Sequence, residues 1–192
     1  MAERVLVIAE AGVNHNGSLL LAGRLIEAAA AAGADVVKFQ TFKAEKVAAK
    51  NTPKADYQRA ATGTEEDQLA MIRRLELSDD DFRGLAAQAR DLDIEFLSTP
   101  FDEQSAEFLA GDIGVRRIKI PSGEITNGPL ILAVARSGLP IILSTGMANL
   151  QEIEEALGII AFGLNAPPGE APSRTAFQAA FDAAMARGDL AR

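Results

Sequence analysis

Five short apolar runs rich in β-branched residues alternate along this chain with longer segments in which apolar residues recur at helical spacing. Uninterrupted alternation of this kind predicts an α/β fold with a parallel sheet and right-handed crossovers. A doubly wound sheet and a (β/α)8 TIM barrel both satisfy the alternation, and polar residues at the end of every strand favour the barrel. The expected strands are residues 5–9, 35–41, 94–100, 117–120 and 140–144, and the expected helices are residues 19–32, 67–75, 78–92, 103–110, 129–137 and 150–164.

Five strands are fewer than a closed barrel of this type needs, so residues 1–165 are interpreted as its first five βα units. The first run, Val5–Ala9, is apolar throughout and is expected to be covered on both faces. The connection at 42–66 is longer than ordinary loops, which is typical of functional or disordered segments. Residues 166–192 form a Pro/Gly linker and an amphipathic helix whose expected packing face carries Phe177, Phe181 and Met185.

The composition limits the classes of partner. The formal net charge of -8 argues against nucleic-acid binding. The chain has no cysteine, which leaves neither a disulfide framework nor a thiolate metal site and suits a cytoplasmic protein. No apolar run approaches the length of a membrane-spanning helix, and the sequence from Met1 leads into a strand without a signal peptide. We therefore expect small-molecule substrates, and an anionic one would need a local basic pocket.

Two lysines lie within the expected strands, Lys38 in the second and Lys119 in the fourth. An unpaired ammonium group is costly to bury, so each lysine should face an anion or a carboxylate. Glu10 and Glu124 could neutralise them as purely structural partners, or could contact sugar hydroxyls and transfer protons. The neutral hydrogen-bonding groups at strand ends, suited to phosphate or carboxylate oxygens, are Gln40, Thr99, Ser122 and Ser144.

The loop after the first strand, Glu10–Gly17, contains the single histidine of the chain. His15 lies between two asparagines and is interpreted as a substrate-contacting or polar loop residue. A metal site needs several His or carboxylate ligands, and the sequence offers no such cluster. The glycines of this loop match neither the dinucleotide fingerprint nor a Walker loop, so nucleotide cofactors have no support.

Five motifs in order resemble the sialic acid synthase family over residues 5 to about 164: Glu10–Gly17, Val37–Gln40, Ser98–Phe101, Lys119–Glu124 and Ser144–Met147. Members of that family condense phosphoenolpyruvate with an N-acetylmannosamine-type sugar and water, and release phosphate and a nine-carbon acid. The resemblance implies a (β/α)8 barrel followed by an antifreeze-like domain. It also implies a domain-swapped homodimer and a divalent metal, Mn²⁺ or Mg²⁺.

Carried over position by position, the resemblance implies roles for individual residues. The two lysines would neutralise the phosphate and carboxylate groups of phosphoenolpyruvate. The implied phosphoenolpyruvate ligands are Lys38, Gln40, Thr99, Lys119, Ser122 and Ser144; the implied catalytic residues are Glu10, Glu124 and Lys119; and the implied sugar-binding residues are Glu10, Asn14 and His15.

The stretch from Lys43 to Gln58 is more similar to bacterial legionaminic-type synthases, whose acceptor is a 2,4-diacetamido-trideoxy sugar. The family's metal-binding histidines and its antifreeze-like domain follow the fifth βα unit. The resemblance therefore implies that no metal ligand and no antifreeze-like domain lies in this chain. We expect the 192-residue chain to be inactive alone.

Three other functions fit the same residues. A Schiff-base aldolase would use Lys38 or Lys119, and borohydride trapping with pyruvate would reveal it. A ketodeoxy-sugar-phosphate synthase would require a phosphorylated acceptor. A non-catalytic binding or assembly subunit is favoured by the missing histidines, whereas the intact phosphoenolpyruvate-type residues argue against it.

Overall fold

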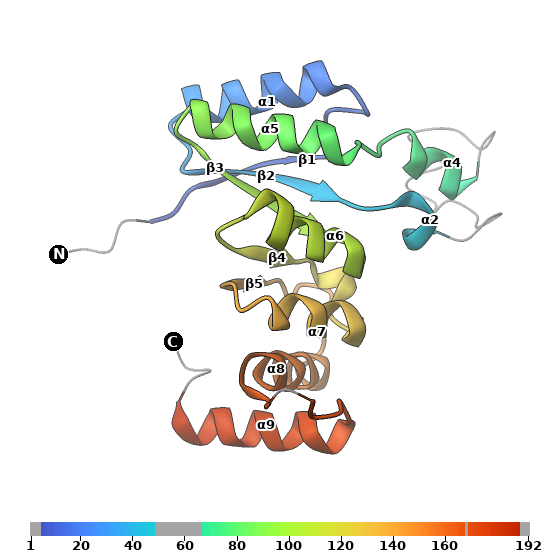
Figure 1. Cartoon of the computed structure of the whole chain (residues 1–192), viewed down its shortest axis with the longest axis vertical. Coiled ribbons are helices and arrows are strands. Elements are labelled where there is room, and N and C mark those ends of the chain that lie inside the picture. The colour runs from blue at the N-terminus through green and yellow to red at the C-terminus, as the bar shows by residue number, and fades with distance from the viewer. Residues whose placement is uncertain (1–4, 49–66, 168, 189–192) are drawn as a thin grey trace. The chain divides into compact units, whose positions relative to one another are not determined.

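The computed structural model of this chain describes residues 5–48, 67–167 and 169–188. It forms two compact units, with the boundary between Ser105 and Ala106 (Figure 1). Each unit contains parallel strands that alternate with helices, which confirms the α/β class and the partial βα arrangement. The boundary predicted at residue 165 lies inside the second unit, between its last two helices.

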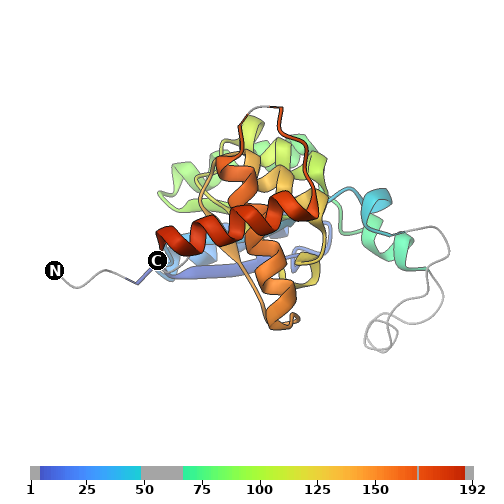
Figure 2. The ribbon, with the colours of Figure 1, turned by 90° about the horizontal axis from the view of Figure 1, so that it is seen from below.

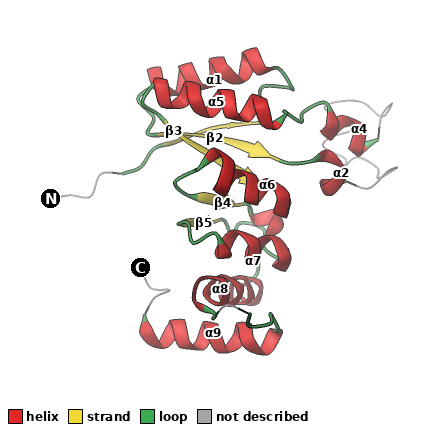
Figure 3. Ribbon diagram, in the orientation of Figure 1, coloured by secondary structure: helices red, strands yellow, loops and turns green. Residues whose placement is uncertain are grey.

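The first unit is built on a parallel sheet in the order β1 (Ile8–Gly12), β2 (Val36–Thr41) and β3 (Glu95–Pro100). Helices α1 (Leu19–Ala31) and α5 (Asp79–Asp91) lie side by side over one face of this sheet (Figures 1 and 3). Their apolar stripes bury the sheet residues beneath them, as the helical spacing predicts. Fully buried side chains of this core include Ile26, Val37, Phe39 and Leu85, and on the opposite face of the sheet Val36 and Leu97 are fully buried as well.

The predicted first strand is displaced along the sequence. Val5, Leu6 and Val7 precede β1 and are exposed, and the strand instead runs into the loop as far as Gly12. The register explains the shift, because β2 begins at Val36 and pairs first with Ile8. Burial of the whole run on both faces is therefore wrong for its first three residues.

Local signals predicted the two long helices of this unit, α1 and α5, but not the short helix at Ala44–Val47. Ser18 caps α1 by accepting a hydrogen bond from the backbone N–H of Leu21, and Ser78 and Asp81 form a reciprocal capping box at α5. Two short helices, α2 (Ala44–Val47) and α4 (Gln68–Arg73), flank the long connection. Residues 49–66 of that connection lie outside the described residues.

The second unit contains β4 (Ile118–Ile120) and β5 (Ile141–Leu143), which pair in parallel. Helix α6 (Glu103–Phe108) continues into a π-helical turn at Leu109–Ile113, and a 3-10 turn at Ser122–Glu124 follows β4. The remaining helices of this unit are α7 (Gly128–Arg136), α8 (Leu150–Asn165) and α9 (Arg174–Arg187). None of the helices in the described ranges is both long and apolar enough to cross a membrane.

Helix α9 crosses α8 at close range (Figure 2). A Cβ atom at Gly158 would lie 2.8 Å from the carbonyl oxygen of Phe177, so only glycine permits this approach. The rings of Phe162 and Phe177 meet edge to face, with centroids 5.2 Å apart. The predicted packing face is corrected at one position: Ala184 is buried there, whereas Met185 is 56% exposed.

Candidate functional site

The first unit gathers three of the predicted site residues at the carboxyl ends of its strands. The ammonium group of Lys38 lies 2.5 Å from a carboxylate oxygen of Glu10 and donates a hydrogen bond to the Thr99 hydroxyl at 3.3 Å. The side chain of Lys38 is only 12% exposed, whereas that of Glu10 is 54% exposed. This arrangement places a paired cation beneath an accessible carboxylate.

The alternation of β2 explains why these groups share one face. Phe39 packs toward the helices and stacks on Phe96, so its neighbours Lys38 and Gln40 point to the opposite face of the sheet. Gln40 pairs in register with Thr99. The sheet therefore presents an ammonium, an amide and a hydroxyl together.

Gly12 keeps space open beside these groups. It has a φ of 54°, and a Cβ atom there would lie 3.1 Å from Glu10 Oε1 and 3.8 Å from Gln40 Nε2. The Glu10 carboxylate and the Gln40 amide therefore both lie close to Gly12. A larger residue at this position would fill this space and also strain the backbone.

His15 lies inside the loop rather than on its surface. Its side chain is fully buried, and its Nδ1 accepts a hydrogen bond of 3.0 Å from the backbone N–H of Gly17. The ring proton is thus assigned to Nε2, which finds no hydrogen-bond partner among the described residues. Burial lowers the pKa of His15 below its ordinary value near 6.5, so the ring is neutral at pH 7. Asn14 is exposed, and a sugar-binding role of either residue stays a prediction.

The second unit holds the other lysine. The ammonium group of Lys119 donates to the Ser144 hydroxyl at 2.5 Å and to the main-chain carbonyl of Ile120 at 3.0 Å. Ser144 follows β5, and its backbone N–H donates to the same carbonyl at 3.1 Å. One cation and one hydroxyl therefore lie at the carboxyl ends of two paired strands.

The 3-10 turn after β4 carries Ser122 and Glu124, both partly exposed. Glu124 accepts a hydrogen bond of 2.8 Å from the side-chain amide of Asn127. The other end of that amide caps α7 through the backbone N–H of Leu130. Glu124 is therefore oriented by the start of a helix, which suits a carboxylate that must keep one position.

The described ranges contain no group of three or more His, Asp or Glu side chains placed to hold a metal ion. They do not fit a metal centre, and no chemical step is assigned to one.

Asp102 was missed by the sequence reasoning. It is 7% exposed, caps α6 by accepting from the backbone N–H of Ser105 and also accepts from the backbone N–H of Lys43. The sequence did contain a signal for this cap, because Asp102 directly precedes the expected helix at 103–110, and aspartate is a favoured N-cap residue. The contact with Lys43 had no local signal, since 59 residues separate the pair.

Two relatives share 51% of their aligned residues with this chain, and both are N,N'-diacetyllegionaminic acid synthases. The Campylobacter jejuni protein aligns over 82% of this chain and 47% of its own length, and the Legionella pneumophila protein over 80% and 43%. The crystal structure of the N-acetylneuraminic acid synthetase of Leptospira borgpetersenii in complex with citrate is 35% identical. It superimposes with a TM-score of 0.70 over 84% of this chain and 51% of that one.

The chain thus spans about half the length of the relatives it matches. Residues 25–176 match the model of the NeuB family. This range includes Lys38, Gln40, Thr99, Lys119, Ser122, Glu124 and Ser144, whereas Glu10 and His15 lie before it. Helix α9 lies mostly beyond the matched residues. By this match over most of its residues, the chain belongs to the NeuB family.

Proposed function

We propose that this chain is the phosphoenolpyruvate-binding part of a nonulosonic acid synthase of the legionaminic or sialic type. The observation that carries the proposal is the Lys38 group: a nearly buried ammonium with an accessible carboxylate and a hydroxyl beside it at the strand ends. Two relatives that are 51% identical are legionaminic acid synthases. That similarity favours a 2,4-diacetamido-trideoxymannose as acceptor over N-acetylmannosamine.

In the proposed reaction, C3 of phosphoenolpyruvate forms a bond with the aldehyde carbon of the open-chain sugar, and the aldehyde oxygen takes up a proton as its π-bond breaks. Water adds at C2 and loses a proton. Cleavage of the C2–O bond then releases phosphate. The two lysines bind the phosphate and carboxylate oxygens of phosphoenolpyruvate as charge-assisted donors. Neutral donors complete this binding, and they are Gln40, Thr99, Ser122 and Ser144.

The two carboxylates have separate proposed roles. Glu10 is accessible and accepts hydrogen bonds from sugar hydroxyl groups, while Glu124, oriented by Asn127, transfers a proton. We propose that the divalent metal, Mn²⁺ or Mg²⁺, takes its ligands outside the described residues. Homodimer formation, a TIM-barrel context, a cytoplasmic location and inactivity of the 192-residue chain alone are parts of the same proposal.

Calorimetric titration with phosphoenolpyruvate tests the binding part. We expect the wild-type chain to bind it and Lys38→Met to weaken binding by about tenfold or more, because a charged hydrogen bond is lost. Lys46→Met is the matched control, since it removes the same charge from an exposed position on α2. A wild-type chain that does not bind phosphoenolpyruvate, or equal affinities for all three proteins, would contradict the proposal.

Assays of turnover test the expected inactivity of the chain alone and the aldolase alternative. Phosphate release by the pure chain with phosphoenolpyruvate and either sugar would refute the expected inactivity. Borohydride trapping of pyruvate on Lys38 or Lys119 would instead establish the aldolase alternative.

A further inference from the structure

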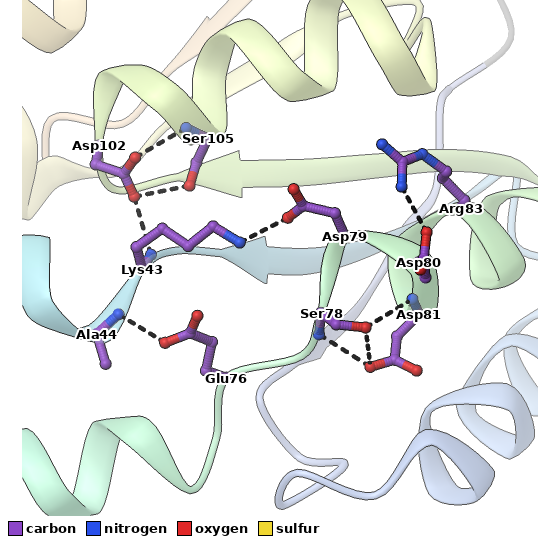
Figure 4. Close-up of polar contacts among 10 residues, drawn as sticks. All are labelled: Lys43, Ala44, Glu76, Ser78, Asp79, Asp80, Asp81, Arg83, Asp102 and Ser105. Atoms are coloured by element: carbon purple, nitrogen blue, oxygen red, sulfur yellow. Dashed lines mark hydrogen bonds and ion pairs between the residues drawn. The ribbon is translucent and has the colours of Figure 1, made fainter.

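A buried carboxylate ties the end of β3 to the segment that follows β2. Asp102 Oδ1 accepts from the backbone N–H of Ser105 at 2.8 Å, and Oδ2 accepts from the Ser105 hydroxyl at 2.7 Å and from the backbone N–H of Lys43 at 3.0 Å (Figure 4). Capping of α6 requires only the first of these bonds. The bond to Lys43 is additional, and it connects two loops that leave neighbouring strands.

The ends of β2 and β3 are also connected by hydrogen bonds closer to the sheet, at Thr41, Ser98 and Phe101. Thr41 and Ser98 share a buried hydrogen bond of 2.7 Å between their hydroxyl groups, and the backbone N–H of Phe101 donates to the Thr41 carbonyl at 3.1 Å. We call Asp102, Thr41 and Ser98 the strand-end clamp. Each member lies within three residues of Gln40 or Thr99 in the sequence.

Two further carboxylates contact the segment Lys43–Ala44, to which Asp102 is bonded. The ammonium group of Lys43 lies 2.6 Å from Asp79, and the backbone N–H of Ala44 donates to Glu76 at 2.8 Å (Figure 4). Lys43 and Ala44 begin α2, where backbone N–H groups have no partner within the helix. Asp102, just before α6, and Glu76, in the loop before α5, accept from these two backbone N–H groups, while Asp79 on α5 pairs with the Lys43 side chain. The start of α2 is therefore held by two backbone hydrogen bonds and one side-chain ion pair.

We propose that Asp102 is a positioning residue for the phosphoenolpyruvate-binding face of the first unit, and this inference rests on the proposed function. By fixing Lys43 relative to Ser105, Asp102 sets the spacing of the carboxyl ends of β2 and β3. That spacing determines where Gln40 and Thr99 lie, and Thr99 in turn accepts a hydrogen bond from Lys38. Small displacements of binding groups are costly, so a loosened strand end weakens ligand binding even when the fold survives.

Asp102→Asn separates positioning from simple capping. The new amide keeps an oxygen for the Ser105 N–H but offers an N–H₂ group, which cannot accept from the Lys43 N–H. Ser105→Ala is the matched variant, because it removes one hydrogen bond to Asp102 and leaves the link to Lys43 intact. Asp80→Asn is the control for the charge change, since Asp80 is 92% exposed on α5.

Two readouts on the 192-residue chain are compared after thermal unfolding has shown that each variant is folded. The first is calorimetric affinity for phosphoenolpyruvate. The second, which needs no ligand, is the NMR position of the Gln40 side-chain amide and the Thr99 methyl group. We expect Asp102→Asn to weaken affinity by about tenfold and to shift both resonances, while Ser105→Ala and Asp80→Asn change neither.

The outcomes are distinguishable. If the wild-type chain binds phosphoenolpyruvate and Asp102→Asn binds it equally well, the positioning role is refuted while the proposed function stands. If the wild-type chain does not bind, the proposed function fails, and the resonances of Gln40 and Thr99 alone decide whether Asp102 sets the strand ends. Unshifted resonances in Asp102→Asn would overturn the inference in either case, as would equal shifts in Ser105→Ala.

Discussion

Lys38 and Lys119 each lie inside a parallel strand, β2 and β4, yet their surroundings differ. Lys38 pairs with the carboxylate of Glu10, whereas the contacts of Lys119 include the Ser144 hydroxyl and the carbonyl of Ile120. An ion pair responds to salt, while a hydrogen bond to a hydroxyl or carbonyl responds much less. The Lys38–Glu10 contact is thus an ion pair, whereas the Lys119–Ser144 contact joins a cation to a neutral hydroxyl.

The supports of the two units differ as well. In the first unit, buried polar groups such as Asp102 connect the loops at the carboxyl ends of the strands. In the second, α8 packs between α7 and α9 through glycines: a Cβ atom at Gly163 would lie 2.5 Å from Ala135 Cβ, and one at Gly158 would meet Phe177. Removing one partner of a buried hydrogen bond lowers the stability of the first kind of contact. Adding a methyl group between closely packed helices lowers the stability of the second kind.

The largest expected effect is on the α8–α9 contact. Gly158→Ala should lower the free energy of unfolding by about 1–2 kcal/mol, because the added methyl group meets a backbone carbonyl. Gly111→Ala in the same unit is the matched control, since a Cβ atom there meets nothing within 4 Å. It should stabilise by up to about 1 kcal/mol through backbone entropy. Urea unfolding measures both, and a stabilising Gly158→Ala would show that α9 does not pack as described.

The second effect concerns the ion pair. Glu10→Gln keeps the shape of the side chain but removes the charge opposite the nearly buried Lys38, and it should cost about 1 kcal/mol. This loss of unfolding free energy is small because Glu10 is 54% exposed and solvent screens the ion pair. The difference in unfolding free energy between wild type and variant should shrink in 1 M salt, where screening already weakens the pair. A difference that does not change with salt would mean that the charge of Glu10 contributes nothing.

Local patterns predicted much of this fold, and long-range contacts explain what they missed. The caps at Ser18 and Ser78 depend on neighbours three residues away and were predictable. The start of β1 depends on where β2 begins, and the burial of Ala184 in place of Met185 depends on the face that α8 presents. Of the candidate site, the sequence predicted the residue types along the strands, and it offered the pairing of Lys38 with Glu10 as one of two alternatives. It could not predict which hydroxyl lies beside which lysine, because that follows from strand register.

Acid should weaken the first unit selectively, because His15 is the single histidine of the chain and lies there. Burial lowers its pKa in the folded state, so below pH 6.5 the unfolded chain binds more protons than the folded one. Stability is therefore full above that pH and falls as the pH drops toward 5. Protonation would also place a second donor against the Gly17 N–H. Hydrogen exchange at pH 7 and 5 should show loosening around residues 12–17. His15→Asn should remove the pH dependence there, and an unchanged exchange pattern in the wild type would contradict it.

The smallest effect is expected at Lys119. Ser144→Ala removes one hydroxyl but leaves the carbonyl of Ile120 as an acceptor, so the free energy of unfolding should fall by only about 0.5–1 kcal/mol. This difference should be the same in 0.1 M and 1 M salt, in contrast to that of Glu10→Gln. Ser137→Ala, which removes a hydroxyl bonded within the end of α7, is the control in the same unit. If Ser144→Ala were as salt-dependent as Glu10→Gln, the Lys119–Ser144 contact would respond to salt like the Lys38–Glu10 ion pair, and the contrast between these two contacts would disappear.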